Sequence, residues 1–247
     1  MKYFLNIYIY TVVILFTVVV SLFFVLYFIF FKIVFTRRVF LKRVRRFISW
    51  YGLIIVKILI FPFIKTEFVD MARNENITPC LFICNHRSSS DPFLLSFLPY
   101  EIVQIVSDWP FRIPMLGFCA KLAGYISIKE MEHDDFFAAA EKLLQQGVCI
   151  AAFPEGTRSG NNKIGQFHGA IFRVALKIKC PIVPLCVIGN ENIPTRDFVL
   201  NPGRIKMKKL PAIFYEKYKD MTPFKLKNYV RNIIAEETVR MENELKI

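Results

Sequence analysis

The chain begins with one long apolar run. No charged side chain occurs between residues 3 and 31. As a helix, these 29 residues would extend about 43 Å, whereas the hydrocarbon core of a bilayer is roughly 30 Å thick. The pattern therefore predicts a tilted membrane-spanning helix over residues 3–31. It fits a cleaved signal peptide less well, because the run is too long and no small-residue cleavage site follows it.

A basic segment and a second apolar stretch come next. Seven Lys and Arg residues lie between residues 32 and 46, and the positive-inside rule places this predicted basic loop in the cytoplasm. The apolar stretch 47–64 has Lys57 near its centre, which costs roughly 2.5–3.5 kcal/mol in a membrane-spanning helix. A second span would also put the remaining chain outside the cytoplasm, away from cytoplasmic metabolites. We expect an interfacial or partly inserted helix over 47–64, with a second full span as the alternative.

From residue 66 onward, short apolar runs alternate with helical patterns. Strands are predicted at 81–84, 102–107, 124–128, 148–153 and 181–188, with weaker candidates at 204–208 and 212–215. Helices are predicted at 92–98, 114–122, 133–146, 167–179 and 223–245. Alternation of this kind is typical of an α/β domain, with a central, mostly parallel sheet flanked by helices. We therefore expect two parts, a helical membrane anchor over 1–65 and a globular domain over 66–247.

Composition and charge support the anchor. The 247 residues are 54% hydrophobic, include 26 Phe and have a mean hydropathy of +0.39. The net charge is +13, but residues 1–65 hold ten basic and no acidic side chains, which leaves +3 for the rest of the chain. Basic residues beside an apolar segment indicate an anionic membrane surface. A nucleic-acid-binding domain would carry its positive charge on a folded face, so we expect no nucleic acid partner.

The six cysteines indicate neither a disulfide framework nor a metal site. They form no C-x-x-C pair and stand mostly in apolar contexts, at positions 80, 84, 119, 149, 180 and 186. We interpret them as small buried hydrophobic residues in a reducing compartment. Cys80, Cys84 and His86 lack a second cluster of ligands, so we expect neither a metal ion nor a cofactor.

The sequence NHRSSSDP, over residues 85–92, follows the predicted strand at 81–84. His86 and Asp91 are five positions apart, so neither a helix nor a strand would bring their side chains together. The serines favour a turn and Pro92 favours a helix start, which predicts Asp91 as an N-cap with its side chain directed toward His86. The carboxylate would fix the imidazole tautomer and leave the other ring nitrogen to accept a proton from a hydroxyl. Alternatively, Asp91 only caps the helix and His86 is an ordinary loop residue.

A second loop, FPEGTRSG, covers residues 153–160 after another predicted strand. Pro154 and Gly156 fit positions i+1 and i+3 of a type I turn. A glycine lets a ligand approach the backbone, exposed N–H groups bind anions, and Arg158 offers a bidentate contact to phosphate. Glu155 is out of place beside a phosphate unless it orients Arg158 or bonds a hydroxyl. The alternative is a surface turn with a solvated ion pair.

The two loops are more informative together. In α/β sheets, ligands bind beyond the carboxyl ends of strands, and both loops follow predicted strands. A proton acceptor beside an anion-binding loop and a membrane anchor predicts an amphipathic substrate with a hydroxyl and a phosphate. NHRSSSD resembles the N-H-x-x-x-x-D motif of the glycerolipid acyltransferases, and FPEGTR resembles their F-P-E-G-T-R motif, in the same order. Residues 113–130 and 180–185 resemble two weaker blocks of that family, so the resemblance covers residues 80–190.

The resemblance implies a membrane-bound 1-acylglycerol-3-phosphate acyltransferase or a related lysophospholipid acyltransferase. It implies that His86 is the general base and that Asp91 orients it. The acceptor hydroxyl of the lysophospholipid would attack an acyl thioester of coenzyme A or acyl carrier protein, at the cytoplasmic face, without a covalent acyl-enzyme. With 1-acylglycerol-3-phosphate the product is phosphatidic acid. The residues implied to bind substrate are Asn85, Glu155, Gly156, Thr157 and Arg158, with Lys129 as a further candidate. The Gly156 backbone is also implied to stabilise the developing oxyanion.

Three departures from the family pattern concern the acceptor. Lys129 and Glu130 stand where the family usually has Asp-Arg, a Lys is missing before the second block, and His168 stands where Lys or Arg is common. Each change removes positive charge that a phosphate would need. Lys129 and Arg173 are candidates to compensate, and an acceptor with another lysolipid headgroup is the alternative.

Two other functional classes fit parts of the sequence. A serine hydrolase is disfavoured because no G-x-S-x-G elbow is present, although residues 88–90 are all serine. A non-enzymatic lipid carrier at the membrane surface would use the anchor and Arg158 but would not need His86. Acyl transfer by the wild type, and its loss on substituting His86, would distinguish the enzyme from the carrier.

Overall fold

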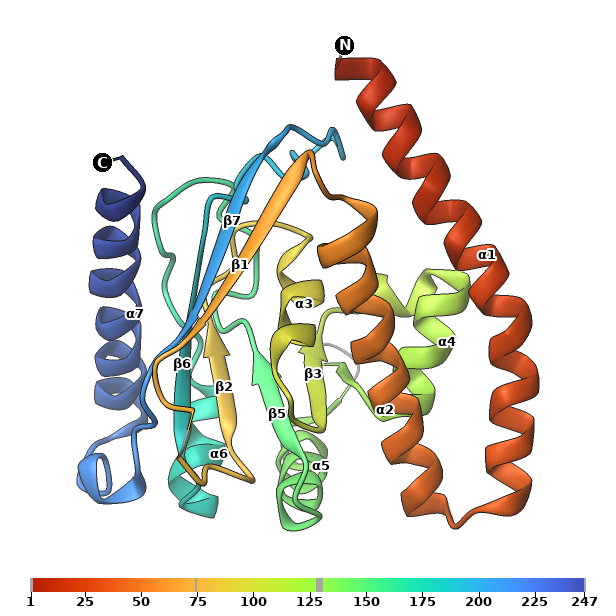
Figure 1. Ribbon diagram of the computed structural model, residues 1–247. Coiled ribbons are helices and arrows are strands. Elements are labelled where there is room, and N and C mark those ends of the chain that lie inside the picture. Colours follow the sequence, from red (N-terminus) through yellow and green to blue (C-terminus); the bar gives the residue numbers. More distant parts are fainter. Residues whose placement is uncertain (1, 74, 128–130, 247) are drawn as a thin grey trace.

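A seven-stranded sheet forms the centre of the molecule. The computed structural model describes residues 2–73, 75–127 and 131–246 (Figure 1). The strands are β1 (Ile64–Asp70), β2 (Leu81–Cys84), β3 (Ile102–Val106), β4 (Ile126–Ser127), β5 (Cys149–Ala152), β6 (Ile182–Ile188) and β7 (Gly203–Lys209). Their order is β1-β7-β6-β2-β5-β3-β4, and neighbours in it pair parallel except β6 and β7. The predicted α/β class with a mostly parallel sheet is confirmed.

Helices cover both faces of this sheet. The first face carries α5 (His133–Gln145), α6 (Ala170–Ile178) and α7 (Pro223–Lys246), which bury Phe136, Phe172 and Val230 in one apolar cluster with strand residues. The other face carries α3 (Asp91–Leu94), the 3₁₀ turn η2 (Leu95–Phe97) and the π-helical turn η1 (Ile55–Leu59). Every residue of β2 and β5 is buried, as expected for parallel strands covered on both faces.

The topology brings the two candidate loops to one edge of the sheet. β2 lies between β5 and β6 and is parallel to both, so that Leu81 is opposite Ile150 on one side and Ile182 on the other. The carboxyl ends of three adjacent strands therefore meet at the upper edge of the sheet in Figure 1. Substrates of α/β proteins bind at this edge.

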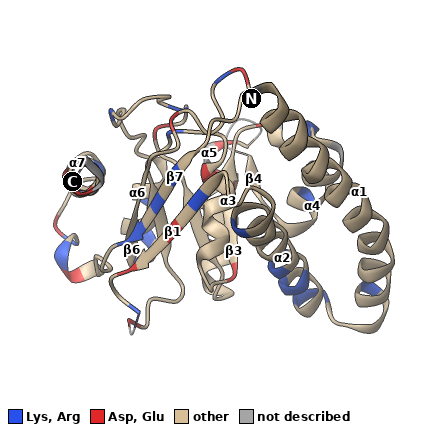
Figure 2. Ribbon diagram, turned by 45° about the horizontal axis from the view of Figure 1, so that its top comes forward, with Lys and Arg blue, Asp and Glu red and all other residues tan. Residues whose placement is uncertain are grey.

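The N-terminal region forms a helical hairpin. Its first arm is the helix α1 (Lys2–Val34). Among the described residues, this is the one helix that is long and apolar enough to cross a membrane. The second arm is α2 (Arg37–Ile54), which lies between α1 and the sheet (Figure 1). The predicted basic loop over 32–46 is wrong for most of its length, because residues 37–46 form the first half of α2. Spacing explains the difference, since all basic residues of α2 except Arg45 occupy its exposed side (Figure 2), whereas Phe40 and Val44 are buried against the molecule.

A buried arginine attaches α2 to the α/β domain. Arg45 is 5% exposed, although the sequence pattern places it in a cytoplasmic loop. Its Nη1 lies 2.6 Å from Glu101 Oε1, and its Nε donates to the Ala123 carbonyl at 2.9 Å. Ala123 is the last residue of α4 (Pro114–Ala123), and both helices share an apolar cluster with α1. The hairpin is therefore packed against the domain.

The stretch 47–64 is not one helix. α2 ends at Ile54, η1 follows, and β1 begins at Ile64. The alternative of a second membrane span is wrong, because Val56, Ile60 and Ile64 are buried in the core beneath the sheet. The sequence pattern does not predict β1, which pairs with β7 over all seven of its residues at the edge of the sheet.

The weakest strand candidate, 212–215, is also wrong. Only an isolated bridge between Ile213 and Ile182 forms there. The other predicted strands and helices are present within a few residues, including the weak candidate at 204–208, which is β7. Thr222 caps the start of α7, because its hydroxyl accepts the Lys225 N–H at 3.3 Å.

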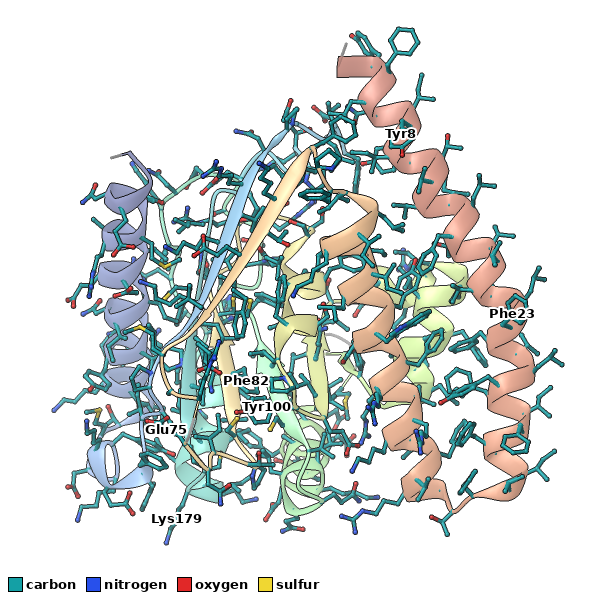
Figure 3. The ribbon with its side chains drawn as sticks, in the orientation of Figure 1. Tyr8, Phe23, Glu75, Phe82, Tyr100 and Lys179 are labelled. Atoms are coloured by element: carbon teal, nitrogen blue, oxygen red, sulfur yellow. The ribbon has the colours of Figure 1, made fainter. Side chains whose placement is uncertain are left out.

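Contacts between α1 and the rest of the molecule run along most of the helix. Near its start, Asn6 bonds the backbone of Leu200. Near its other end, the rings of Phe28 and Phe40 pack edge to face with centroids 5.7 Å apart. The opposite side of α1 exposes large apolar residues, among them Phe23, which points away from the domain (Figure 3).

Candidate active site

His86 and Asp91 meet in the loop that follows β2. His86 Nδ1 lies 2.7 Å from Asp91 Oδ2, within hydrogen-bond distance. The Asp91 side chain is fully buried and the His86 side chain is 17% exposed, so the imidazole reaches the surface while its partner does not. Nε2 of His86 has no hydrogen-bond partner in the part of the chain that the structure describes. The ring can therefore accept a proton at Nε2 from a bound ligand.

The backbone of the loop wraps around the Asp91 carboxylate. Oδ2 also accepts the N–H groups of Arg87, at 2.8 Å, and Ser88, at 2.9 Å. α3 begins at Asp91 itself, after Ser90, and no side chain caps its first turn. The predicted N-cap role of Asp91 is therefore wrong, because three donors of the preceding loop use this oxygen. The prediction that its side chain turns back toward His86 is confirmed.

Asn190 completes the surroundings of Asp91. This residue follows β6, is fully buried, and donates from Nδ2 to Asp91 Oδ1 and to Ser90 Oγ. Its Oδ1 is buried without a hydrogen-bond partner among the described residues. Sequence reasoning missed Asn190, whose only signal is its position as a polar residue just after a buried strand that ends at the same sheet edge.

Two of the three serines in the first loop, Ser88 and Ser90, have structural roles. Ser88 Oγ and Ser90 Oγ both donate to the Ile193 carbonyl, at 3.0 Å and 2.7 Å. Neither hydroxyl bonds His86, whereas a serine nucleophile needs a hydrogen bond to its base. This arrangement argues further against a serine hydrolase.

The second candidate loop is hydrogen-bonded directly to the first. The Ser159 N–H donates to the His86 carbonyl at 2.8 Å. The predicted turn is closed by the Gly156 N–H, which donates to the Phe153 carbonyl at 3.0 Å. The Phe153 ring lies 4.6 Å from the imidazole of His86, measured between centroids. The prediction that both loops gather at one end of the sheet is confirmed.

The buried Glu155 side chain links the second loop to the first by hydrogen bonds to backbone N–H groups. Its Oε1 accepts the His86 N–H and its Oε2 accepts the Gly165 N–H, both at 2.7 Å. The residue is buried, and burial raises the pKa of its carboxyl above the ordinary value, against the two backbone hydrogen bonds that lower it. Both oxygens are engaged with backbone, which favours a positioning role for Glu155 over direct contact with a substrate.

Arg158 is the candidate ligand for an anion. Its guanidinium forms no hydrogen bond or ion pair with another described residue, and its carbon lies 5.9 Å from the Phe198 ring centroid. Gly156 has a φ of +71°, in the left-handed region that favours glycine. Gly156 and Thr157 are both exposed. An anion can therefore approach the backbone and the guanidinium together.

The candidates for additional positive charge lie in different places. Lys129 is outside the described residues. Arg173 lines a hollow between α5 and α6, together with Asp134 and Glu141. Lys163 and His168 line a separate hollow of about 400 Å³ beside the second loop. Lys163 is therefore better placed than Arg173 to supply positive charge near Thr157, which lines the same hollow.

Asn85 is part of the sheet edge. It is fully buried, its Nδ2 donates to the Val187 carbonyl at 2.9 Å, and its Oδ1 accepts the Val187 N–H at 2.8 Å. The side chain thereby continues the pairing of β2 with β6 beyond the last strand residue. This geometry favours an architectural role for Asn85 over contact with substrate.

A buried ion cluster lies behind the first loop. Arg87 is 2% exposed, pairs with Glu191, and places Nη2 2.7 Å from Glu242 Oε1 of α7. The same Nη2 donates to the Asn162 carbonyl at 3.3 Å. Arg87 thus links the first loop, the second loop, the segment after β6 and the C-terminal helix. No local sequence pattern indicates this cluster, because 104 positions separate Arg87 from Glu191.

The cysteines do not contribute a nucleophile. All six are buried and free of disulfides, which confirms their interpretation as core residues. Burial raises the pKa of Cys84, which ends β2, well above its ordinary value, so its thiol stays protonated. Within the described ranges, no three His, Cys, Asp or Glu side chains lie close enough to hold a metal ion.

Comparison with known proteins places this site in a family context. A family model described as Acyltransferase matches residues 65–188. The chain is 30% identical over 172 residues to 1-acyl-sn-glycerol-3-phosphate acyltransferase BAT2, chloroplastic, of Brassica napus, which covers 66% of this chain and 49% of that protein. It is also 30% identical over 146 residues to 1-acyl-sn-glycerol-3-phosphate acyltransferase alpha of Mus musculus, covering 56% of this chain and 51% of that protein. The chain thus spans about half the length of these curated relatives.

A solved structure shares the fold over almost the whole chain. The crystal structure of the 1-acyl-sn-glycerophosphate (LPA) acyltransferase PlsC from Thermotoga maritima matches with a TM-score of 0.78. The match covers 98% of each chain at 19% sequence identity. It includes the helical hairpin as well as the α/β domain, so the N-terminal region is part of the shared architecture.

Proposed function

Because this chain belongs to the acyltransferase family, we propose that it transfers a fatty acyl group from an acyl thioester to the free hydroxyl of a lysophospholipid. The observation that carries the proposal is the hydrogen-bonded pair His86–Asp91, whose Nε2 has no partner among the described residues, in a loop joined to the one that bears Arg158. A base and a cation that is unpaired within the described part of the chain, both at one sheet edge, suit an acceptor with a hydroxyl and a phosphate. The relatives' names support 1-acylglycerol-3-phosphate as the acceptor and phosphatidic acid as the product.

His86 acts as the general base in the proposed reaction. Its Nδ1–H donates to Asp91, and Nε2 takes the proton of the acceptor hydroxyl as the oxygen attacks the thioester carbonyl. The tetrahedral intermediate collapses, the carbon–sulfur bond breaks, and the imidazolium returns the proton to the leaving thiolate. The buried Asp91 carboxylate stabilises the imidazolium between these steps. Acyl-CoA and acyl carrier protein both supply such a thioester.

The second loop binds the acceptor in this proposal. Arg158 contacts the phosphate, and the exposed Thr157 offers its backbone N–H to the phosphate or the developing oxyanion. The oxyanion role that the family resemblance implies for the Gly156 backbone is disfavoured, because the Gly156 N–H is already donated to the Phe153 carbonyl. Glu155 holds the backbone of His86 in place, and its effect on catalysis is indirect. Lys129 stays a candidate for the headgroup.

Residues 1–65 attach the protein to the membrane in this proposal, with residues 66–247 at the cytoplasmic face. Asn6 and Phe28 both contact the rest of the molecule. They are 22 positions apart, so the helix rises about 33 Å from one to the other, which is more than the roughly 30 Å thickness of the hydrocarbon core. A helix crossing the bilayer would place these contacts on opposite sides. The contacts therefore favour a helix α1 that lies along the membrane surface, with its exposed apolar side embedded in the lipid. They disfavour the membrane-spanning orientation that the sequence predicts.

The proposal is tested by acyl transfer to 1-acylglycerol-3-phosphate in mixed micelles, with acyl-CoA and acyl carrier protein compared as donors. His86→Ala should lower kcat about 10²–10⁴-fold, the usual contribution of a general base, with little change in melting temperature. Near-full activity of a folded His86→Ala protein would refute the mechanism. A wild type that binds the lysolipid but never acylates it with either donor would favour the lipid carrier.

A different lysolipid acceptor is the second candidate. The observation that favours it is His168, which lines the hollow beside the second loop where relatives with Lys or Arg would place a fixed charge. A panel of lysolipids that share one acyl chain and differ in headgroup measures kcat/KM for each. A preference for a headgroup other than phosphate monoester would replace 1-acylglycerol-3-phosphate as the acceptor and leave the roles of His86 and Asp91 unchanged.

A further inference from the structure

Arg158 rests against an aromatic ring and has no acidic partner. Its guanidinium carbon is 5.9 Å from the Phe198 ring centroid, and no ion pair holds it within the described chain. A cation–π contact fixes the position of an arginine without occupying its N–H donors. A carboxylate would occupy the donors that a phosphate needs. Phe198 is thus suited to hold Arg158 ready for an anion.

The backbone at Phe198 has a conformation that residues other than glycine rarely adopt. Its φ is +58°, in the left-handed region. A tight turn maintains it, in which the Phe198 N–H donates to the Thr195 carbonyl at 3.0 Å and the Thr195 N–H donates to the Val199 carbonyl at 2.9 Å. Such conformations persist where surrounding contacts hold them, and they are common at functional positions.

The first turns of α1 provide further contacts to this turn. Asn6 Nδ2 donates to the Leu200 carbonyl at 2.9 Å, and Asn6 Oδ1 accepts the Leu200 N–H at 2.7 Å. The Tyr10 hydroxyl donates to the Phe198 carbonyl. The helix α1, which carries the exposed apolar surface, is therefore hydrogen-bonded to the backbone of Phe198 and Leu200.

The same segment reaches the catalytic pair. Residues 190–200, which we call the bridging segment, begin with Asn190, the donor to Asp91. Its Ile193 carbonyl accepts the hydroxyls of Ser88 and Ser90, two of the three serines in the first loop. The bridging segment is thus bonded to α1 at one end and to the His86 loop at the other, with the Arg158 contact between them.

We propose that Phe198 is a positioning residue for Arg158 and that the first turns of α1 hold Phe198 in place. Acceptor binding then depends on how α1 packs against the bridging segment. A displacement of α1 would weaken phosphate binding by Arg158. The inference rests on the proposed role of Arg158 in binding the acceptor. It adds a second role for α1 beyond attachment to lipid.

The first experiment compares Phe198→Ala with the wild type in steady-state kinetics. The expected result is an acceptor KM about 2–5-fold higher, which corresponds to about 0.4–1 kcal/mol, with kcat and the donor KM unchanged. Phe198→Trp should restore the acceptor KM, because it restores the ring. Phe224→Ala is the matched control, since Phe224 is also exposed and its ring also faces a cation, Lys227 at 4.9 Å, on α7. It should change neither KM.

The second experiment uses Asn6→Ala and Arg158→Ala. Asn6→Ala should raise the acceptor KM alone, with unchanged binding to phosphatidylglycerol vesicles, and should have little further effect once Arg158 is removed. If Arg158→Ala raises the acceptor KM while Phe198→Ala and Asn6→Ala do not, this inference is overturned and the proposed function stands. If Arg158→Ala leaves the acceptor KM unchanged, the phosphate role of Arg158 itself is wrong. Equal changes in both KM values and kcat for Phe198→Ala would indicate general disorder and would also overturn it.

Discussion

Replacing Asp91 with Asn removes one charge from the candidate site and preserves the shape of the side chain. Asp91 accepts three hydrogen bonds at Oδ2 and one, from Asn190, at Oδ1. An asparagine has a single accepting oxygen, so its amide NH₂ must face one of these groups of donors. Asn190 can adapt, because its own Oδ1 is buried without a partner among the described residues. Rotation of the Asn190 amide would present that oxygen to the new NH₂.

The cost in stability is therefore moderate. A hydrogen bond to a charged group contributes about 1.5–3 kcal/mol and a neutral one about 0.5–1.5 kcal/mol. The three bonds at Oδ2 weaken but keep their acceptor, and bonds within one network do not add fully. We expect Asp91→Asn to lower the free energy of unfolding by about 2–4 kcal/mol. The melting temperature of a chain of this size should fall by about 2–4 °C for each kcal/mol.

Activity should fall much further than stability. The imidazolium that forms when His86 takes a proton loses its buried counter-charge, so the transition state is destabilised. We expect kcat to drop about 10²–10⁴-fold. The acceptor KM should stay within about threefold, because Asp91 is buried and does not reach the acceptor.

The assay measures initial rates of acyl transfer at saturating donor, well below the melting temperature of the variant, with urea unfolding to give the folded fraction. Asp220→Asn makes the same chemical change at an exposed position away from the loops and should leave kcat unchanged. A folded Asp91→Asn protein with more than a tenth of the wild-type kcat would refute the role of Asp91. A loss of kcat that merely follows the unfolded fraction would refute it as well.

Three further predictions concern the groups around the site. Glu242→Gln should lower the free energy of unfolding, measured in urea, by about 1–3 kcal/mol, because it weakens a buried pair with Arg87. The control is Glu236→Gln on an exposed side of the same helix, which should change the free energy of unfolding by less than about 0.5 kcal/mol. Burial raises the pKa of Glu155 in the folded state, so the native protein binds more protons than the unfolded chain at pH values between the ordinary and the raised pKa. The stability of the wild type relative to Glu155→Gln should therefore decrease as pH rises through that window. A stability difference that increases with pH would contradict this prediction. Burial raises the pKa of Cys180 to about 12, and all six cysteines are buried, so a thiol reagent at pH 8 should label none of them rapidly in the native protein and all six after denaturation.

Local patterns were sufficient for most of the α/β domain. The apolar run at 81–84 and the turn and cap residues after it predict β2 and its loop, because burial on both faces leaves a continuous apolar signal. β1 escaped prediction for the opposite reason. Its sequence IKTEFVD is mostly polar, it lies at the edge of the sheet, and only pairing with β7 makes it a strand. The basic segment after α1 was misread as a loop because its charges were counted without regard to the helical side that they occupy.

The candidate site divides in the same way. His86, Asp91 and Arg158 can be picked out from sequence, since each belongs to a short motif whose residue types have limited chemical uses. Asn190 and Glu242 cannot, because each acts through a partner about a hundred or more positions away and belongs to no motif. Glu155 is an intermediate case, because its motif identifies the residue but suggests contact with substrate, whereas its carboxylate is bonded to backbone N–H groups.

The amino-acid sequence was therefore enough to propose the reaction chemistry, because side-chain type and short-range spacing set which groups are candidates for the base, the orienting acid and the anion ligand. It was also enough to predict lipid contact at one end of the chain, since apolar length and charge are properties of composition. The three-dimensional contacts were needed to show how α1 packs against the bridging segment, how the two loops are bonded to each other, and which residues hold His86 and Asp91 together. Those properties depend on contacts between segments far apart in the chain, such as Asn6 with Leu200 and Arg87 with Glu242, and the free energy of such contacts exists only once the sheet has brought the segments together.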